Sequence, residues 1–229
     1  MAAKAIVSYD DTHNDHDALS LARVLAGAGA ELTLAYVRHT TQSSREREEL
    51  EENEAQALLE RGARWLDDIE VDRQVVVSGS TGEGLKWLAE RDDADIVVFG
   101  SDYRTAAGHV APQGSTWKLL EGGTAAVAIA PANYRSNRDP QIGRIGLIVT
   151  PGDDIAIETA RDIAERFDAT LSRDERHVDM LIVGSRAEAH EGRVMLSSQA
   201  QNEIENATCP VLVLPRGVRI HFAPPIYVA

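Results

Sequence analysis

Two stretches, "GSDYRTAAGHVAPQGST" (residues 100–116) and "GSRAEAHEGRVMLSSQA" (residues 184–200), align without a gap at an offset of 84 residues. Each follows a short apolar run, DIVVFG or DMLIVG, of the kind found in strands that helices cover on both faces. The flanking segments align at the same offset, so that residues 95–131 match residues 179–215. Both copies read as strand, Gly-Ser, loop, helix, strand and proline, which indicates an internal repeat.

Strand and helix signals alternate through the first 131 residues. Short β-rich runs occupy residues 3–10, 31–39, 73–79, 95–100 and 125–131, and helical periodicity occupies residues 15–30, 42–66, 81–94 and 115–123. Asp15 or Asp17 is expected to cap the first helix and Thr81 the third. The highly charged second helix has four candidates for its inner face, Leu50, Ala57, Leu58 and Trp65. This alternation predicts an α/β fold with an open, parallel, five-stranded sheet covered on both faces.

The second copy is too short to repeat the whole arrangement. Its strands are expected at residues 143–151, 178–185 and 209–215, and its helices at residues 153–167 and 197–207. The segment from residue 167 to the next strand spans about a dozen residues, where the first copy has two strands and two helices. The sequence therefore predicts a duplication with a shortened second part, divided into a complete domain, a linker, a truncated, degenerate repeat and a tail: residues 1–135, 136–142, 143–217 and 218–229.

Composition excludes several classes of partner. The net charge of −14 argues against nucleic acid. No apolar run approaches the roughly 18 residues of a membrane span, and the first residues lack the layout of a signal peptide. The single cysteine, Cys209, allows no internal disulfide and is expected to be a small buried side chain. We therefore expect a cytoplasmic protein that binds neither nucleic acid nor membranes.

The first glycine-rich stretch ends in a candidate anion site. Ligands of open α/β sheets bind at the carboxyl ends of the strands, and here Gly114, Ser115 and Thr116 open a helix close to such an end. Free N–H groups and the helix dipole favour an anion there; the alternative is a tight turn with a Ser/Thr helix cap. Asp10 ends the first strand on the same rim, where it could accept a hydrogen bond from ribose or adenine or merely be one of several acids that begin a helix.

Other motifs do not support catalysis or metal binding. "GSTGEGLK" (residues 79–86) places its lysine one residue late for a phosphate-binding loop and lacks the following Ser or Thr. No serine or cysteine stands in a nucleophile elbow. His13 and His16 flank Asp15 in a weak metal pattern that is more typical of surface residues. We predict neither catalytic residues nor a metal site.

Taken together, the chain resembles a universal stress protein. The resemblance is carried by "AIVSYDDT", "ADIVVFGSDYRTAAGHVAPQGSTWKLLEGGTAAVAIAP" and "VDMLIVGS…GRVMLSS…ATCPVLVLPRG". It implies a Rossmann-like sheet of the adenine-nucleotide alpha-hydrolase type and dimerisation through the last strand. It also implies an adenine nucleotide as ligand, ATP or AMP, with Mg²⁺ accompanying ATP, and at most weak ATP hydrolysis.

The resemblance also implies which residues bind the nucleotide. An aspartate that ends the first strand, a segment after the second strand and a Gly-x-x-Gly-x9-Gly-Ser/Thr loop correspond to seven residues here: Asp10, Val37, Gly100, Gly108, Gly114, Ser115 and Thr116. Three features depart from the family pattern. Tyr103 stands where the second glycine is expected, although Gly108 offers another; the loop is one residue longer; and Asp11 replaces a glycine.

The second copy departs further. Pro151 stands about where the aspartate belongs, and Ser198 and Gln199 replace Gly114 and Ser115. We expect no nucleotide there. We expect either a homodimer through the last strands or an internal pseudo-dimer, in which the surviving strands of the second copy supply a partner to the first domain. The protein is thus predicted to be a nucleotide-binding regulator of the stress response. A nucleotide-free scaffold is the alternative, and a hydrolase or transferase with Asp10 or His109 as base is a third reading.

Overall fold

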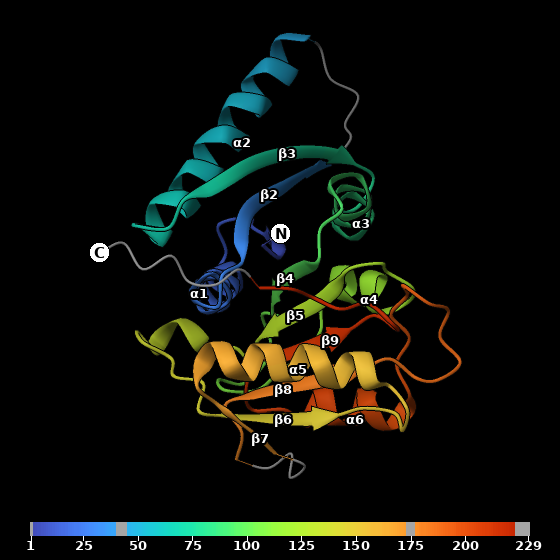
Figure 1. Ribbon diagram of the computed structural model, residues 1–229. Helices are drawn as coiled ribbons and strands as arrows, with labels where there is room; N and C mark the ends of the chain where they lie inside the picture. Colours follow the sequence, from blue (N-terminus) through green and yellow to red (C-terminus); the bar gives the residue numbers. More distant parts are fainter. Residues whose placement is uncertain (1, 40–44, 173–176, 223–229) are drawn as a thin grey trace.

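The computed structural model (Figure 1) describes residues 2–39, 45–172 and 177–222, except for the side chains of residues 45–50. The elements are, in chain order, β1 (Lys4–Ser8), α1 (His13–Gly27), β2 (Glu31–His39), α2 (Arg45–Leu66), β3 (Val71–Ser78), α3 (Thr81–Asp92), β4 (Ile96–Gly100), α4 (Gly114–Leu120), β5 (Ala126–Ala130), the 3₁₀ turn η1 (Tyr134–Ser136), β6 (Arg144–Ile148), α5 (Asp154–Phe167), β7 (Thr170–Ser172), β8 (Met180–Gly184), α6 (Ser198–Asn206) and β9 (Val211–Leu214). We call β1 to β5 and their helices the first half, and β6 to β9 with theirs the second half.

All nine strands form one sheet in the order β3-β2-β1-β4-β5-β9-β8-β6-β7. Every neighbouring pair is parallel except β5 and β9, which are antiparallel. The predicted α/β class and the open, parallel, five-stranded sheet of the first half are confirmed. A continuous order of this kind places the carboxyl ends of β1, β2 and β4 on one edge, which is where the candidate site was expected.

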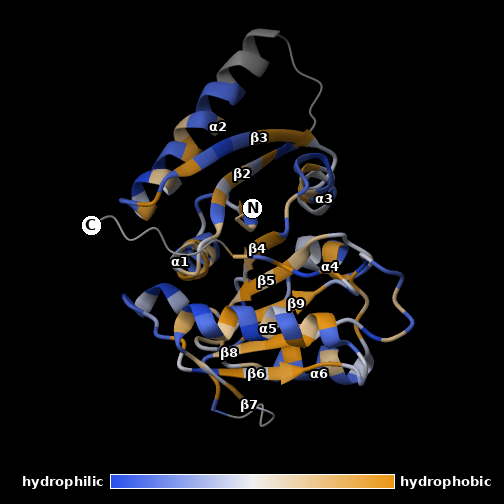
Figure 2. Ribbon diagram, in the orientation of Figure 1, coloured by the Kyte–Doolittle hydropathy of each residue, from blue (hydrophilic) through white to orange (hydrophobic). Residues whose placement is uncertain are grey.

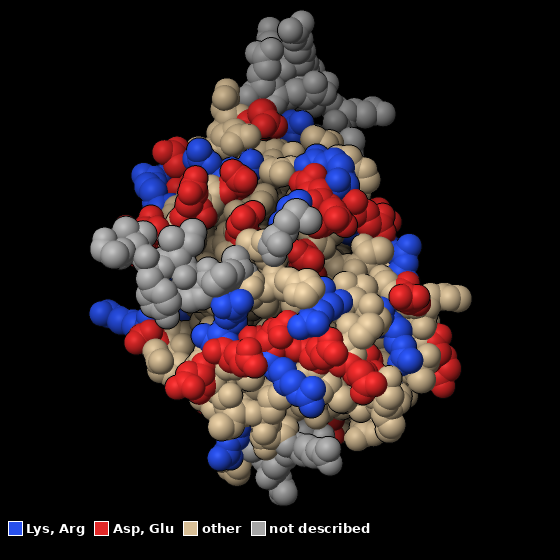
Figure 3. All heavy atoms as spheres, viewed as in Figure 1, with Lys and Arg blue, Asp and Glu red and all other residues tan. Residues whose placement is uncertain are grey.

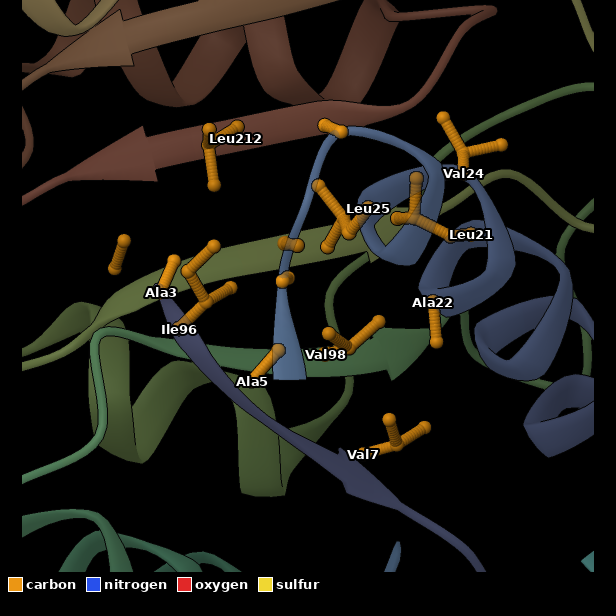
Figure 4. Close-up of a cluster of buried hydrophobic side chains, with 14 of the residues drawn as sticks. Ala3, Ala5, Val7, Leu21, Ala22, Val24, Leu25, Ile96, Val98 and Leu212 are labelled. Atoms are coloured by element: carbon orange, nitrogen blue, oxygen red, sulfur yellow. The ribbon is translucent and has the colours of Figure 1, made fainter. Parts of the chain in front are cut away.

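Helices cover both faces of the sheet. Buried residues of α1, α2 and α5 belong to one hydrophobic cluster, and those of α3, α4 and α6 to another. The central strands β4, β5, β8 and β9 between them are strongly apolar, whereas β2 and β3 are mixed (Figure 2). Figure 4 shows the first cluster, in which Leu21, Val24 and Leu25 of α1 lie over β1 and β4 and near Leu212 of β9. The two halves therefore share a core.

The two halves are related by an approximate two-fold axis that passes between β5 and β9. In the β5–β9 pair Ala128 lies opposite Leu212, its own counterpart at the 84-residue offset, with Val127 opposite Val213 and Ile129 opposite Val211. Two further hydrogen bonds cross between the halves in a reciprocal way, from Val110 N to Ala207 O (3.1 Å) and from Val194 N to Gly123 O (2.9 Å). The last strands thus pair within one chain, as the sequence predicted for a pseudo-dimer.

The ends of several helices differ from expectation. Thr12, not Asp15 or Asp17, caps α1, with Asp15 at the third helical position completing a capping box. Ser80, not Thr81, caps α3. On α2, Ala57 is exposed, Leu58 and Trp65 are only partly buried, and Leu50 lies outside the described side chains. The buried residues among the described side chains of this helix are Ala55, Leu59, Gly62 and Leu66. These misassignments are shifts of one to five positions within correctly placed helices.

The second half is shortened in the way its sequence suggests. Between α5 and β8 the described residues contain only the three-residue strand β7, which was not predicted, and no counterpart of α2, β3 or α3. The described part of the tail, residues 218–222, contains no strand. It packs against α5 through Arg219, which pairs with Asp162 and Glu158, and through buried Ile220.

The surface mixes charges. Acidic and basic side chains alternate across the face shown in Figure 3, so the negative net charge is not gathered into one large field on that face. Among the described helices, none combines the length and apolar character that crossing a membrane requires.

Candidate functional site

The corner between β1 and α1 presents Asp10. Its backbone N–H donates to the Asp15 carboxylate (2.9 Å), which also accepts from Thr12 N (3.0 Å) and Thr12 Oγ1 (2.7 Å). This capping box fixes the turn, because three donors converge on one buried carboxylate oxygen. No described residue donates a hydrogen bond to the Asp10 carboxylate itself, so both of its oxygens are available to a ligand.

Asp10, Val37 and Ser115 line one cavity of about 120 Å³. They come from the end of β1, from β2 and from the first turn of α4, with Thr81 of α3 and Gln113 completing the wall. Val37 lies within β2, two residues before its end, rather than after the strand. The fold therefore brings three of the seven sequence-predicted residues to one place, although they are separated by up to 105 positions.

The charge state of Asp10 follows from its surroundings. Burial raises the pKa of its carboxyl, and the neighbouring Asp15 carboxylate raises it further. Burial likewise raises the pKa of Asp15, against the opposing effect of the hydrogen bonds from Thr12. A ligand that donates a hydrogen bond to the Asp10 carboxylate would favour its ionised form. It would thereby offset the two effects that raise the pKa of Asp10, burial and repulsion by Asp15.

Asp11 serves a different purpose from Asp10. Its backbone adopts a left-handed conformation (φ 57°), which aspartate tolerates, and its carboxylate accepts from Tyr9 Oη (2.8 Å) and Arg61 Nε (2.7 Å). These hydrogen bonds lower the pKa of Asp11 to about 2. Asp11 does not line the cavity; instead it ties the β1–α1 corner to α2. Its identity was noted in the sequence only as a departure from the family pattern.

Four of the seven sequence-predicted residues do not line the cavity, namely Gly100, Gly108, Gly114 and Thr116. A Cβ at Gly100 would lie 1.9 Å from Asn14 O, so this glycine is explained by the close approach of α1 to β4. Gly108 has φ +81° and donates its N–H to Ala132 O (2.7 Å), which makes it a turn residue. Thr116, in the first turn of α4, is fully buried, and its hydroxyl oxygen has no hydrogen-bond partner in the described part of the chain. Packing and turn geometry account for Gly100 and Gly108 in this structure.

Gly114 and Tyr103 both lie at the surface of the loop. Nothing lies within 4 Å of a Cβ added at Gly114, where α4 begins. Tyr103 is 70% exposed and stacks with Arg104, whose guanidinium lies 4.9 Å from the ring centroid. Tyr103 lines a neighbouring cavity of about 680 Å³ and not the cavity that holds Asp10. It therefore does not close the candidate site.

The equivalent region of the second half has a different chemistry. β6 pairs with β8 as β1 pairs with β4, and Ile145 lies beside Met180 as Ala5 lies beside Ile96. In this register Thr150, not Pro151, is the counterpart of Asp10. The cavity there, of about 600 Å³, is lined mainly by apolar side chains and contains no carboxylate. The absence of nucleotide from this half stays a prediction. Among the described residues no cluster of His, Cys, Asp or Glu could hold a metal ion.

The buried thiol has no chemical role in this site. Cys209 lies two residues before β9 and is 9% exposed, and burial raises its pKa to about 12. A thiol that stays protonated at neutral pH is a poor nucleophile. The prediction that Cys209 is a small buried side chain is confirmed.

Comparison with known proteins gives a consistent result. A model of the universal stress protein family matches residues 1–131 and 169–215. A universal stress protein from Archaeoglobus fulgidus is similar in structure over 93% of this chain and 98% of its own (TM-score 0.71, 15% identity). A putative universal stress protein from Pseudomonas aeruginosa is similar over 93% of each chain (TM-score 0.62, 16% identity). No curated protein sequence matches the chain. The family match covers well over half of the residues, and the chain belongs to the universal stress protein family.

Proposed function

We propose that the first half binds an adenine nucleotide, ATP or AMP, and that the protein acts as a regulator in the stress response that responds to adenylates. Mg²⁺ would accompany ATP. The observation that carries the proposal is the convergence of Asp10, Val37 and Ser115 on one cavity at the carboxyl edge of the sheet. Membership of the universal stress protein family supports the same ligand class.

Each of the three residues has a chemistry that suits a nucleotide. The unpaired Asp10 carboxylate can accept hydrogen bonds from ribose hydroxyls. Val37, in β2, offers an apolar wall with backbone polar groups beside it, suited to a purine. The Ser115 hydroxyl can donate to a phosphate oxygen, and the open surface at Gly114 lets a phosphate approach the backbone. No residue of the site is assigned a catalytic role.

One observation favours the alternative of a nucleotide-free scaffold. The cavity of about 120 Å³ is smaller than the roughly 300 Å³ at which ligand pockets usually begin. A nucleotide would have to extend beyond it, over the open surface at Gly114 or into the adjacent cavity. A direct measurement of bound ligand decides between the two functions.

The first experiment is made on protein purified without added nucleotide. The protein is denatured, and the supernatant is separated by ion exchange and identified by mass spectrometry. Stoichiometric ATP, ADP or AMP supports the proposal. An empty supernatant, together with no thermal shift in millimolar ATP or AMP with Mg²⁺, favours the scaffold.

A matched pair of variants locates the site. Gly114→Glu places a carboxylate at the open surface where a phosphate would lie, and since nothing lies within 4 Å of its Cβ the fold should persist. We expect loss of nucleotide binding in calorimetric titration. Ser198→Glu introduces the same charge at the equivalent exposed position of the second half and should leave binding unchanged. Retained binding in Gly114→Glu, or equal loss in both variants, contradicts the assignment.

A further inference from the structure

Two cavities lie side by side at the candidate site. The smaller, of about 120 Å³, holds Asp10, and the larger, of about 680 Å³, holds Tyr103, Thr105 and Arg135. Only Thr12 and Gln113 line both. Thr12 is held in the capping box of α1, which leaves Gln113 as the adjustable side chain between them.

The Gln113 amide is held across the boundary by a single bond. Its Nε2 donates to the carbonyl oxygen of Gly100 at the end of β4 (3.0 Å). Gln113 occupies the cap position of α4 but makes no side-chain capping bond. One neutral hydrogen bond contributes only about 0.5–1.5 kcal/mol net, and the side chain is half-buried. The Gln113 side chain, which separates the two cavities, is therefore held in place only weakly.

The larger cavity presents two donors to an anion, Thr105 and Arg135, beside the carboxylates of Asp17 and Asp102, which also line it. The Thr105 hydroxyl oxygen is shielded from solvent and has no hydrogen-bond partner in the described part of the chain. Arg135 Nη1 donates to Asp17 (2.9 Å) and to His13 O (3.1 Å), while no described residue accepts from its Nη2. A hydroxyl without a partner and a guanidinium with a free edge are donors to phosphate oxygens.

We infer that Gln113 determines which adenylate the site accepts. With its amide on the Gly100 carbonyl, the site takes a nucleoside or nucleoside monophosphate and gives the outer phosphates of ATP no contacts. Once the side chain is removed, the two cavities join and a polyphosphate chain reaches Thr105 and Arg135. This inference rests on the proposed function and specifies the ligand class of the same site.

The test compares AMP and ATP, the latter with Mg²⁺, in calorimetric titrations of the wild type and of Gln113→Ala. The wild type should bind ATP no more tightly than AMP. Gln113→Ala should bind ATP about tenfold more tightly than the wild type does, the gain expected from one or two charge-assisted hydrogen bonds. Its AMP affinity should change less than its ATP affinity, because Gln113→Ala leaves Asp10, Val37 and Ser115 in place while it opens the path to Thr105 and Arg135. Ser197→Ala, the equivalent change in the second half, should alter neither affinity.

Two results would overturn the inference while leaving the proposed function intact. One is a wild type that binds ATP at least about tenfold more tightly than AMP. The other is an unchanged ATP-to-AMP ratio in Gln113→Ala that has kept its thermal stability. Failure of the wild type and of the variant to bind any adenylate overturns the proposed function and this inference together. A double variant, Gln113→Ala with Arg135→Met, should lose the ATP gain again and so identifies where the outer phosphates lie.

Discussion

The loops that follow β4 and β8 are built alike. Ser101 donates to Ala130 O (2.7 Å) and Ser185 to Leu214 O (2.8 Å), its counterpart at the same offset. The turns close in the same way, since Gly108 N donates to Ala132 O and Gly192 N to Arg216 O, each at 2.7 Å. Both glycines have positive φ, +81° and +74°. The backbone of the loop is thus the same in the half with a candidate site and in the half without one.

The loops differ where each meets its helix. In the first half Gln113 donates to the Gly100 carbonyl and leaves α4 without a side-chain cap. In the second half Ser197 caps α6 by accepting from Ala200 N (3.1 Å). The shared hydrogen bonds therefore belong to folding and to the pairing of the two halves. The chemistry that could recognise a ligand is confined to the few residues that differ, Gln113 and Asp10 above all.

The largest expected effect is a difference in stability between alanine variants of the equivalent glycines Gly100 and Gly184. An added Cβ would lie 1.9 Å from the backbone oxygen of Asn14 at Gly100, but 3.1 Å from a flexible Val149 methyl at Gly184. We expect Gly100→Ala to lower the free energy of unfolding by about 3 kcal/mol or more and Gly184→Ala by about 1 kcal/mol. Urea denaturation of both variants measures the difference. Equal losses would mean that α1 can move away from β4 as easily as Val149 can rotate.

The fold could be predicted from the sequence because it depends on repeated patterns. Continuous apolar runs at residues 96–100 and 180–184 identify buried parallel strands, and the offset of 84 identifies the internal repeat. The pairing of the last strands was implied by the resemblance to the family. β7 was missed because three half-exposed residues carry no periodicity. Packing determined which residues of α2 are buried, and a charged helix gives only a weak signal of its inner face.

The structure brings three of the predicted site residues to one cavity. Asp10 and Ser115 follow from the end of a strand and the start of a helix, features visible in the sequence, whereas Val37 was implied by the resemblance to the family. Gly100 and Thr116 do not line the cavity, and a glycine needed for close packing looks the same in a sequence as one that faces a phosphate. Two further contacts could not be predicted from the sequence. The hydrogen bond from Gln113 to Gly100 depends on a side-chain conformation, and the role of Asp11 depends on its contact with Arg61 of the distant helix α2.

The second expected effect tests what the two loops share. Ser101 and Ser185 are almost fully buried, and each also accepts a backbone N–H, from Ala111 (3.2 Å) and Met195 (3.1 Å). Either serine-to-alanine change leaves a buried donor without its partner. Each variant should lose about 2 kcal/mol in the free energy of unfolding, and the two losses should agree within about 0.5 kcal/mol. Exposed Ser198→Ala is the control, with a change within about 0.5 kcal/mol. Clearly unequal losses at Ser101 and Ser185 would show that the loops differ in more than their helix junctions.

The smallest expected effect tests what distinguishes the loops. Ser197→Ala removes the cap of α6 and should lower the free energy of unfolding by about 1 kcal/mol. In the first half the reciprocal change is Gln113→Ser, which supplies a cap that α4 lacks. Its proper reference is Gln113→Ala, because both variants lose the bond to the Gly100 carbonyl.

We expect Gln113→Ser to be more stable than Gln113→Ala by about the same 1 kcal/mol in urea titrations. If Gln113→Ser exceeds Gln113→Ala in stability by as much as Ser197→Ala loses, the junctions of α4 and α6 have the same geometry. Only the side chain then distinguishes them. If serine at position 113 gives no advantage over alanine, the start of α4 is shaped differently from that of α6. The absence of a cap would then be a property of the backbone around Gly114, and the likeness of the two loops would end before the helix begins.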